Sequence, residues 1–178
     1  MKLDLSEDLK SHNAYCITDP DGARQISTLK NLRSLELTYC VEENGLREQD
    51  MIAMFNNYNM ANLELLSLSG FEPSIITNEL VKVIADNCPK LYYFNIYKAQ
   101  FINNDCIGYL IKKHATLKYL SVCKCYNLDP EFMYEAVKSS PSRKLKINTY
   151  QGIIVWNKSK EKVFLDSSGS LWNTTIEM

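Results

Sequence analysis

The sequence is poor in glycine and histidine, and this scarcity bears first on catalysis. Six glycines are spread over 178 residues, and none forms the glycine-rich loop that cradles phosphates in nucleotide-binding proteins. The two histidines, His12 and His114, belong to no H-E-x-x-H pattern, and there is no G-x-S-x-G. Because no acid, base and nucleophile form a recognisable constellation, we predict that the chain is not an enzyme and needs no cofactor.

Long apolar runs and an excess of one charge are also missing. No stretch approaches the roughly 18 uncharged apolar residues of a membrane-spanning helix, so we expect no membrane insertion. The N-terminus, Met1 to Asp8, is acidic and lacks an apolar region, so we expect no secretory signal. The formal net charge is −1, which does not steer the chain toward nucleic acid. We therefore expect a cytoplasmic protein, with a nuclear location as the alternative.

The six cysteines are scattered rather than arranged as metal-ligand pairs. Only Cys123 and Cys125 lie close together, whereas a tetrahedral zinc site usually takes two such pairs, so we predict no metal site. Without a secretory signal we expect free thiols. Cys40, Cys88 and Cys125 are predicted to be small buried packing residues, with Cys123 facing the other way. His114 falls near a predicted helix end, where we expect capping or solvation.

Four segments of the chain repeat the pattern L-x-x-L-x-L-x-x-C, with related residues at some positions. They align without gaps and are Asn31–Cys40, Asn62–Phe71, Lys90–Ala99 and Thr116–Cys125. The spacing narrows from 31 to 28 to 26 residues (Leu32 to Leu63, to Leu91, to Leu117), near the roughly 20–29 residues typical of leucine-rich repeats. A fifth, partial copy is Leu145-Lys146-Ile147 with Tyr150 at the cysteine position, which we align so that Leu145 matches Leu120.

The residue spacing within each copy predicts a strand followed by a helix. Apolar residues two apart, such as Leu35 and Leu37, face one side of a strand, and the spacing of Leu80 and Ile84 is helical. We predict strands at 34–38, 65–69, 93–97, 119–123 and 145–148, with helices capped by Thr77 and by Asp129 before Pro130. The expected fold is α/β, a leucine-rich-repeat solenoid with a parallel concave sheet and outer helices, because stacked units bury a continuous core.

The two ends of the chain differ from the repeats. Residues 1–28 are predicted to be an irregular first unit or N-terminal cap, with a degenerate strand at Leu3-Asp4-Leu5 and a turn at Asp19–Gly22. Residues 29–150 hold the leucine-rich repeats. Residues 151–178 are predicted to form a C-terminal cap, in which Ile153–Trp156 and Val163–Asp166 are strands of a β-hairpin.

The run from Leu80 to Leu91, with Cys88-Pro89-Lys90-Leu91 at its end and Phe94 and Ile96 after it, resembles the cysteine-containing leucine-rich repeat. This subtype is typical of F-box leucine-rich-repeat proteins, the substrate-recruiting subunits of SCF ubiquitin ligases. The resemblance covers residues 29–150 and implies a protein-interaction module that recruits a substrate. No F-box is visible, and residues 1–28 are too few to hold one. The alternative is a non-catalytic scaffold factor that uses the same repeats without ubiquitin.

The strand positions between the leucines are predicted to face the concave side, which is the usual binding surface of a solenoid. There the alignment brings Tyr93, Tyr97 and Tyr119 together, with Lys98 and Lys124 around them. We predict that these residues bind a protein partner with an acidic or phosphorylated segment, and that the chain is a monomer within that complex. The alternative is that the tyrosines are ordinary amphipathic strand residues. The same alignment places Lys144 beside Tyr119 and Lys146 beside Ser121.

Overall fold

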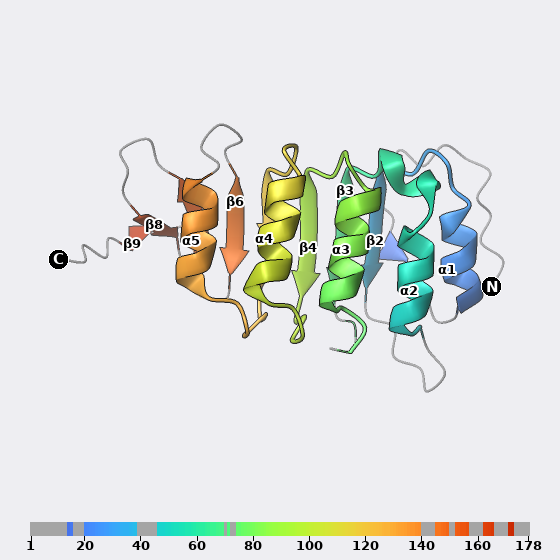
Figure 1. The fold of residues 1–178 in the computed structure, drawn as a ribbon, viewed down its shortest axis with the longest axis horizontal. Coiled ribbons are helices and arrows are strands. Elements are labelled where there is room, and N and C mark those ends of the chain that lie inside the picture. The colour runs from blue at the N-terminus through green and yellow to red at the C-terminus, as the bar shows by residue number, and fades with distance from the viewer. Residues whose placement is uncertain are drawn as a thin grey trace.

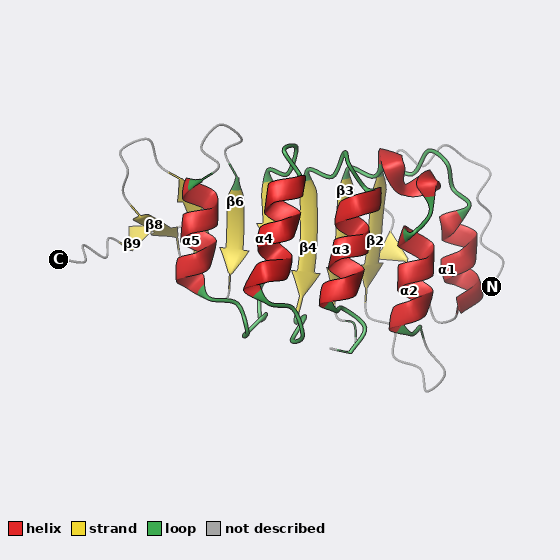
Figure 2. Cartoon of the chain, in the orientation of Figure 1, coloured by secondary structure: helices red, strands yellow, loops and turns green. Residues whose placement is uncertain are grey.

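Strands and helices alternate along the chain and form two layers. The computed structural model describes residues 14–15, 20–38, 46–69, 71, 74–139, 145–149, 152–156, 162–165 and 171–172. Figures 1 and 2 show the helices side by side in one layer, covering one face of the sheet. This is the α/β class with parallel strands that the sequence predicts.

The sheet follows chain order from its first strand to its last. The parallel strands are β1 Ala14–Tyr15, β2 Ser34–Thr38, β3 Leu65–Ser69, β4 Tyr93–Tyr97, β5 Tyr119–Ser121 and β6 Lys146–Thr149. Three antiparallel strands follow, β7 Gly152–Trp156, β8 Lys162–Leu165 and β9 Leu171–Trp172. The predicted bounds of β2, β3 and β4 are confirmed, while β5 ends two residues before its prediction.

Each parallel strand is separated from the next by a helix. The helices are α1 Pro20–Ser27, α2 Glu48–Phe55, α3 Asn78–Asn87, α4 Asn104–Lys113 and α5 Pro130–Lys138, with a short 3-10 helix at Tyr58–Asn62. Polar side chains cap the N-termini of α3, α4 and α5, because the first backbone amides of a helix have no hydrogen-bond partner within it. Thr77, Asn103 and Asp129 accept hydrogen bonds from those amides, and Pro130 stands at the first helical position. The predicted caps at Thr77 and Asp129 are confirmed.

The repeated leucines pack between the sheet and the helices. Leu35, Leu66, Phe94 and Leu120 are register partners on successive strands, so equivalent positions of neighbouring copies lie side by side. The side chains of Leu66 and Leu120 are 0% exposed, as predicted. Because side chains alternate along a strand, the residues between these leucines face away from the helices. The repeat therefore builds one continuous core and one sheet face that carries no described helix.

The alignment of the fifth copy is wrong by two residues. Tyr119 pairs with Lys146 and Leu120 with Ile147, so Leu145 does not match Leu120 and Lys144 does not lie beside Tyr119. Seven residues (139–145) separate α5 from β6, against five (114–118) between α4 and β5. A register shift of two residues leaves each side chain of β6 on the same face of the sheet, because side chains alternate along a strand. Ile147 is therefore still buried and Lys146 still exposed.

The predicted turn at Asp19–Gly22 is wrong, because Pro20 is the first residue of α1 and Gly22 lies within that helix. Asp19-Pro20 repeats the Asp129-Pro130 pair that opens α5, and proline is favoured at a first helical position. The predicted strand Leu3-Asp4-Leu5 lies outside the described residues, as do Cys40 and Tyr150. Near the C-terminus, β7 and β8 overlap the two predicted short strands and pair antiparallel.

Candidate protein-binding surface

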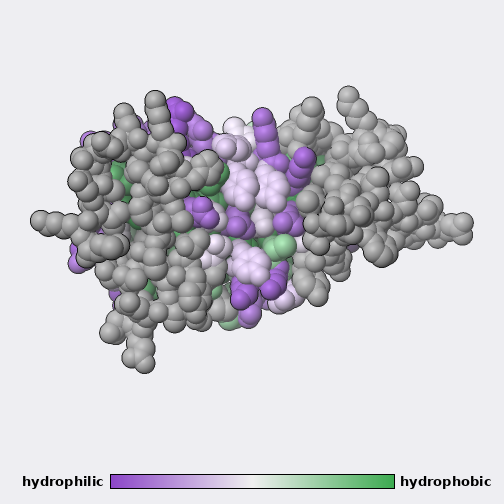
Figure 3. All heavy atoms as spheres, turned by 180° about the vertical axis from the view of Figure 1, so that it is seen from behind, coloured by the Kyte–Doolittle hydropathy of each residue, from purple (hydrophilic) through white to green (hydrophobic). Residues whose placement is uncertain are grey.

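Three tyrosines lie on the sheet face opposite to the helices. Tyr93 and Tyr97 are on β4, and Tyr119 is on β5, each half-buried. The rings of Tyr93 and Tyr119 stack, with centroids 4.9 Å apart and planes 3° apart. Figure 3 views the molecule from this side and shows hydrophilic and intermediate residues gathered over the described strands. The structure thus brings the predicted tyrosines onto one face and two of them into contact.

Two lysines flank the ring of Tyr97. The Nζ atom of Lys124 lies 5.3 Å from the ring centroid, and that of Lys98 lies 5.7 Å from it. Both distances are within the range of a cation–π interaction, which is about 6 Å. Hydrogen bonding to the Tyr97 phenol raises the pKa of Lys124, so its ammonium stays charged at neutral pH. We call these two lysines and the three tyrosines the tyrosine–lysine surface.

Both lysines of this surface adopt a left-handed backbone conformation. The φ angle is 64° at Lys98 and 59° at Lys124, at equivalent positions of successive units. A residue with a Cβ atom loses roughly 1–2 kcal/mol in this conformation, whereas glycine adopts it freely. The Lys98 amide donates a hydrogen bond to the Cys123 carbonyl oxygen at 3.0 Å, which ties the two turns together. At both positions a lysine adopts a conformation in which glycine would be unstrained. Such backbone strain is common at functional sites.

The charge on this face changes sign across the strands. Glu36 lies on β2, while Lys98, Lys124 and Lys146 lie at β4 to β6. Burial raises the pKa of the Tyr93 phenol, and the neighbouring Tyr119 and Glu36 raise it further, so this hydroxyl remains a neutral donor. Asn95, which lies between Tyr93 and Tyr97 on β4, donates a hydrogen bond to the Ser67 hydroxyl at 3.1 Å. The β4–β6 part of the face is thus the part suited to an anion.

The described cysteines do not form a reactive or metal-binding cluster. The Cys125 thiol is buried and donates to the Ile96 carbonyl oxygen at 3.1 Å, whereas the Cys123 thiol donates to the Thr149 carbonyl oxygen at 3.2 Å. The two side chains therefore face opposite ways, as predicted, and the burial predicted for Cys88 and Cys125 is confirmed. Burial raises the pKa of Cys88 and of Cys125 to about 12. Within the described ranges, no three His, Cys, Asp or Glu side chains gather as metal ligands.

His114 is buried rather than solvated. Its side chain is 1% exposed, and its amide caps α4 by donating to the Leu110 carbonyl oxygen at 3.0 Å. His114 is therefore the C-cap residue of α4 through its backbone amide, and the prediction of solvation is wrong. His114 lies 26 residues after Cys88, which is the capping residue of α3, and three residues before Leu117, as Cys88 is before Leu91. The histidine therefore occupies the packing position of the helix-end cysteine, a position that the sequence alignment missed.

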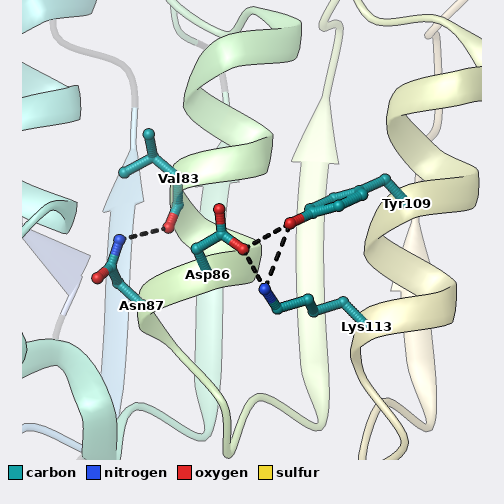
Figure 4. A network of polar contacts seen from close by, with 5 residues as sticks. All are labelled: Val83, Asp86, Asn87, Tyr109 and Lys113. Carbon is teal, nitrogen blue, oxygen red and sulfur yellow. Dashed lines mark hydrogen bonds and ion pairs between the residues drawn. The ribbon is translucent and has the colours of Figure 1, made fainter.

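A network of polar groups joins α3 and α4 on the opposite, helical side (Figure 4). Asp86 accepts hydrogen bonds from the Tyr109 hydroxyl at 2.6 Å and from the Lys113 ammonium, and these lower the pKa of its carboxyl group. The carboxylate and ammonium side chains are 45% and 46% exposed, so water screens them. The network links the two helices across their exposed surface. No described helix is long and apolar enough to cross a membrane.

A cavity at the end of β5 was not foreseen from the sequence. It has a volume of about 220 Å³, and its described lining includes Val122, Cys125, Leu128 and Met133. It lies beside the turn that holds Lys124. The sequence signal is weak, because Leu128 is only one more apolar residue before a predicted helix.

No protein-family model matches the sequence, and no curated protein matches it. The resemblance to F-box leucine-rich-repeat proteins therefore rests on the repeat residues themselves.

Proposed function

We propose that this chain is a leucine-rich-repeat protein-interaction module that binds a partner protein on the tyrosine–lysine surface and has no catalytic role. The observation that carries the proposal is the flat pair of stacked rings, Tyr93 and Tyr119, beside Tyr97 and its two lysines. Stacked phenols offer a large apolar area with hydroxyl groups at the edge, which is the composition favoured at interfaces.

The repeat arrangement supports the leucine-rich-repeat part of the proposal. Equivalent residues of four copies are register partners, and each strand–helix unit contacts its neighbours through the same apolar positions. In such a stack the side chains between the leucines form a continuous row over several strands. A partner that lies across the strands therefore meets one residue from each unit in turn.

The charge distribution supports an acidic or phosphorylated partner segment. Lys98 and Lys124 place two ammonium groups at one tyrosine ring, and Lys146 lies on the strand next to Tyr119. Carboxylate and phosphate oxygens accept charge-assisted hydrogen bonds from such groups. Because the backbone of both lysines is fixed by specific turns, their side chains start from adjacent fixed points on this face.

Two roles fit this surface. In a substrate-recruiting role the bound protein is passed to a ubiquitin ligase, and the resemblance of Leu80–Leu91 to F-box leucine-rich-repeat proteins favours it. In a scaffold role the same surface holds a component of an assembly, and no ligase subunit is needed.

Quantitative affinity capture tests the proposal and separates the roles. The full chain and its Tyr93→Ala/Tyr119→Ala variant are used as baits, and Tyr58→Ala, which removes a tyrosine 93% exposed on the 3-10 helix, is the control. We expect at least one protein to be retained by the wild type and the control and depleted with the double variant. Co-capture of cullin-complex subunits supports the ligase role, and their absence supports the scaffold role. Identical capture by all three baits would contradict the proposed surface.

A further inference from the structure

The cavity at the end of β5 is lined mainly by apolar side chains, with Thr149 as a polar residue of its wall. Val122, Cys125 and Met133 are buried in its wall, while Leu128 is half-buried and Tyr126 is 62% exposed. Lys124 directly precedes Cys125, and its ammonium is near enough to Tyr126 for the two to affect one another electrostatically. An apolar recess thus lies next to the cationic end of the tyrosine–lysine surface.

The preceding unit differs from this one at the position of Leu128. Its equivalent residues, 26 positions earlier, are Ile96, Ala99, Ile102 and Ile107, and all are at most 1% exposed. In that unit Ile102 is 0% exposed, whereas its counterpart Leu128 is half-buried. After β6 the strand direction reverses at β7, so the parallel strand–helix repeat does not continue beyond α5. The cavity therefore marks where the stacking pattern ends.

The cavity is the size of a side chain rather than of a metabolite. Its volume of about 220 Å³ is below the roughly 300–1,000 Å³ of small-molecule pockets. A dry apolar cavity of about 150 Å³ is already enough for a benzene ring. One leucine, methionine or phenylalanine side chain would fit it.

We propose that this cavity receives one large apolar side chain of the partner segment whose acidic residues lie at Lys98 and Lys124. The inference rests on the proposed function and narrows it to a linear segment in which acidic residues adjoin one apolar anchor. Charge complementarity selects a segment over a second copy of this chain, because the two lysines and Lys146 would repel their own counterparts. An extended chain advances about 3.3 Å per residue, so a few residues reach from the lysines to the cavity.

Selection from a phage-displayed library of random 12-residue peptides tests this on the full chain. The wild type is expected to enrich peptides that carry several Asp or Glu residues and one Leu, Met or Phe. Leu128→Ala enlarges the cavity and should shift the anchor toward Phe and Trp. Leu128→Trp fills it and should reduce enrichment of the apolar residue by about tenfold or more, while acidic residues are still enriched. Tyr58→Ala is the matched surface control, and circular dichroism checks that each variant is folded.

The outcomes separate this inference from the function on which it rests. If the wild type enriches acidic peptides with no apolar anchor, or if neither Leu128 variant changes the anchor, the cavity has no such role and the tyrosine–lysine surface still binds. If the selected peptides bind Tyr93→Ala/Tyr119→Ala as well as the wild type, the proposed function itself is overturned. An anchor that becomes larger with Leu128→Ala supports the inference even if Leu128→Trp fails to fold.

Discussion

The rings of Tyr93 and Tyr119 stack at 4.9 Å because their residues are register partners on adjacent parallel strands. Neighbouring strands lie about 4.7–4.9 Å apart, so equivalent side chains of successive units are spaced at stacking distance by the backbone itself. The repeat therefore produces the aromatic surface without any further device. Replacing one ring removes an interaction of roughly 0.5–1.5 kcal/mol, which is small beside the loss of a core leucine.

The first prediction concerns the core. Leu66→Ala and Leu120→Ala should each lower the free energy of unfolding by about 2–5 kcal/mol, because both side chains are fully buried. Leu65 precedes Leu66 on β3, faces the other side and is half-buried, so Leu65→Ala is a matched control that should cost far less. Denaturant unfolding measures all three. A loss below about 0.5 kcal/mol for Leu66→Ala is the magnitude of a surface site and would show that the register is wrong.

The second prediction concerns the left-handed turns. Lys124→Gly should leave the free energy of unfolding unchanged or raise it by up to about 1 kcal/mol, because relief of roughly 1–2 kcal/mol of strain offsets the greater freedom of glycine in the unfolded chain. Lys118 is exposed and has no positive φ, so Lys118→Gly should be destabilising by about 0.5–1 kcal/mol. Equal destabilisation by Lys124→Gly and Lys118→Gly would contradict the claim that the backbone is strained at Lys124. Lys124→Gly should still weaken partner binding.

The third prediction concerns pH. The pKa of Cys88 is raised to about 12 by burial, so the neutral thiol contributes stability that is full below its ordinary pKa near 9 and is lost as pH rises toward 12. Ionisation in the unfolded state should lower the free energy of unfolding by roughly 1–2 kcal/mol between pH 8 and pH 10. This loss should be smaller in Cys88→Ala. An identical pH dependence in the two proteins would contradict it.

Thiol modification offers an independent check on the same burial. Among the described cysteines Cys123 is partly exposed, whereas Cys88, Cys106 and Cys125 are buried; burial raises the pKa of all four thiols, so exposure is what distinguishes Cys123. We expect Cys123 to react with iodoacetamide before these three, as mass spectrometry of peptides would show. Faster labelling of Cys125 would place its side chain on the wrong face.

The fourth prediction concerns the ion pair of Asp86 and Lys113 between α3 and α4. Asp86→Asn should lower the free energy of unfolding by no more than about 1 kcal/mol at pH 7, because the ion pair is exposed. The pKa of Asp86 is lowered, so its contribution is present above the ordinary carboxyl pKa and is lost as pH falls through the lowered value. The difference between the two proteins should vanish once the pH is below that lowered pKa. A difference that persists there would have a cause other than charge.

Much of the fold is predictable because the repeat carries its own register. Leu35, Leu66 and Leu120 occupy the same place in each copy, and the structure pairs their strands accordingly. The fifth copy is misaligned because loop length is not fixed by the apolar pattern, and two additional residues before β6 move Lys146 next to Tyr119. The start of α1 at Pro20 was missed because aspartate–proline is also a turn signal.

The candidate site is predictable only in part. Alternation along β4 and β5 is sufficient to place the three tyrosines on one face. Side-chain packing decides the rest, including the approach of Lys98 and Lys124 to the ring of Tyr97 and the burial of His114 in the place of a cysteine. The cavity beside Leu128 lies where the parallel repeat ends, and the residue pattern around Leu128 does not predict that end.

The most direct test of the central claim is calorimetric titration of an acidic peptide, selected on the wild type, into the wild type and into Tyr93→Ala/Tyr119→Ala. The proposal predicts that the double variant binds more weakly by more than about 1 kcal/mol, roughly fivefold or more in Kd, while its circular dichroism spectrum remains that of the wild type. Equal Kd values for the two folded proteins would contradict the assignment of this face as the binding surface.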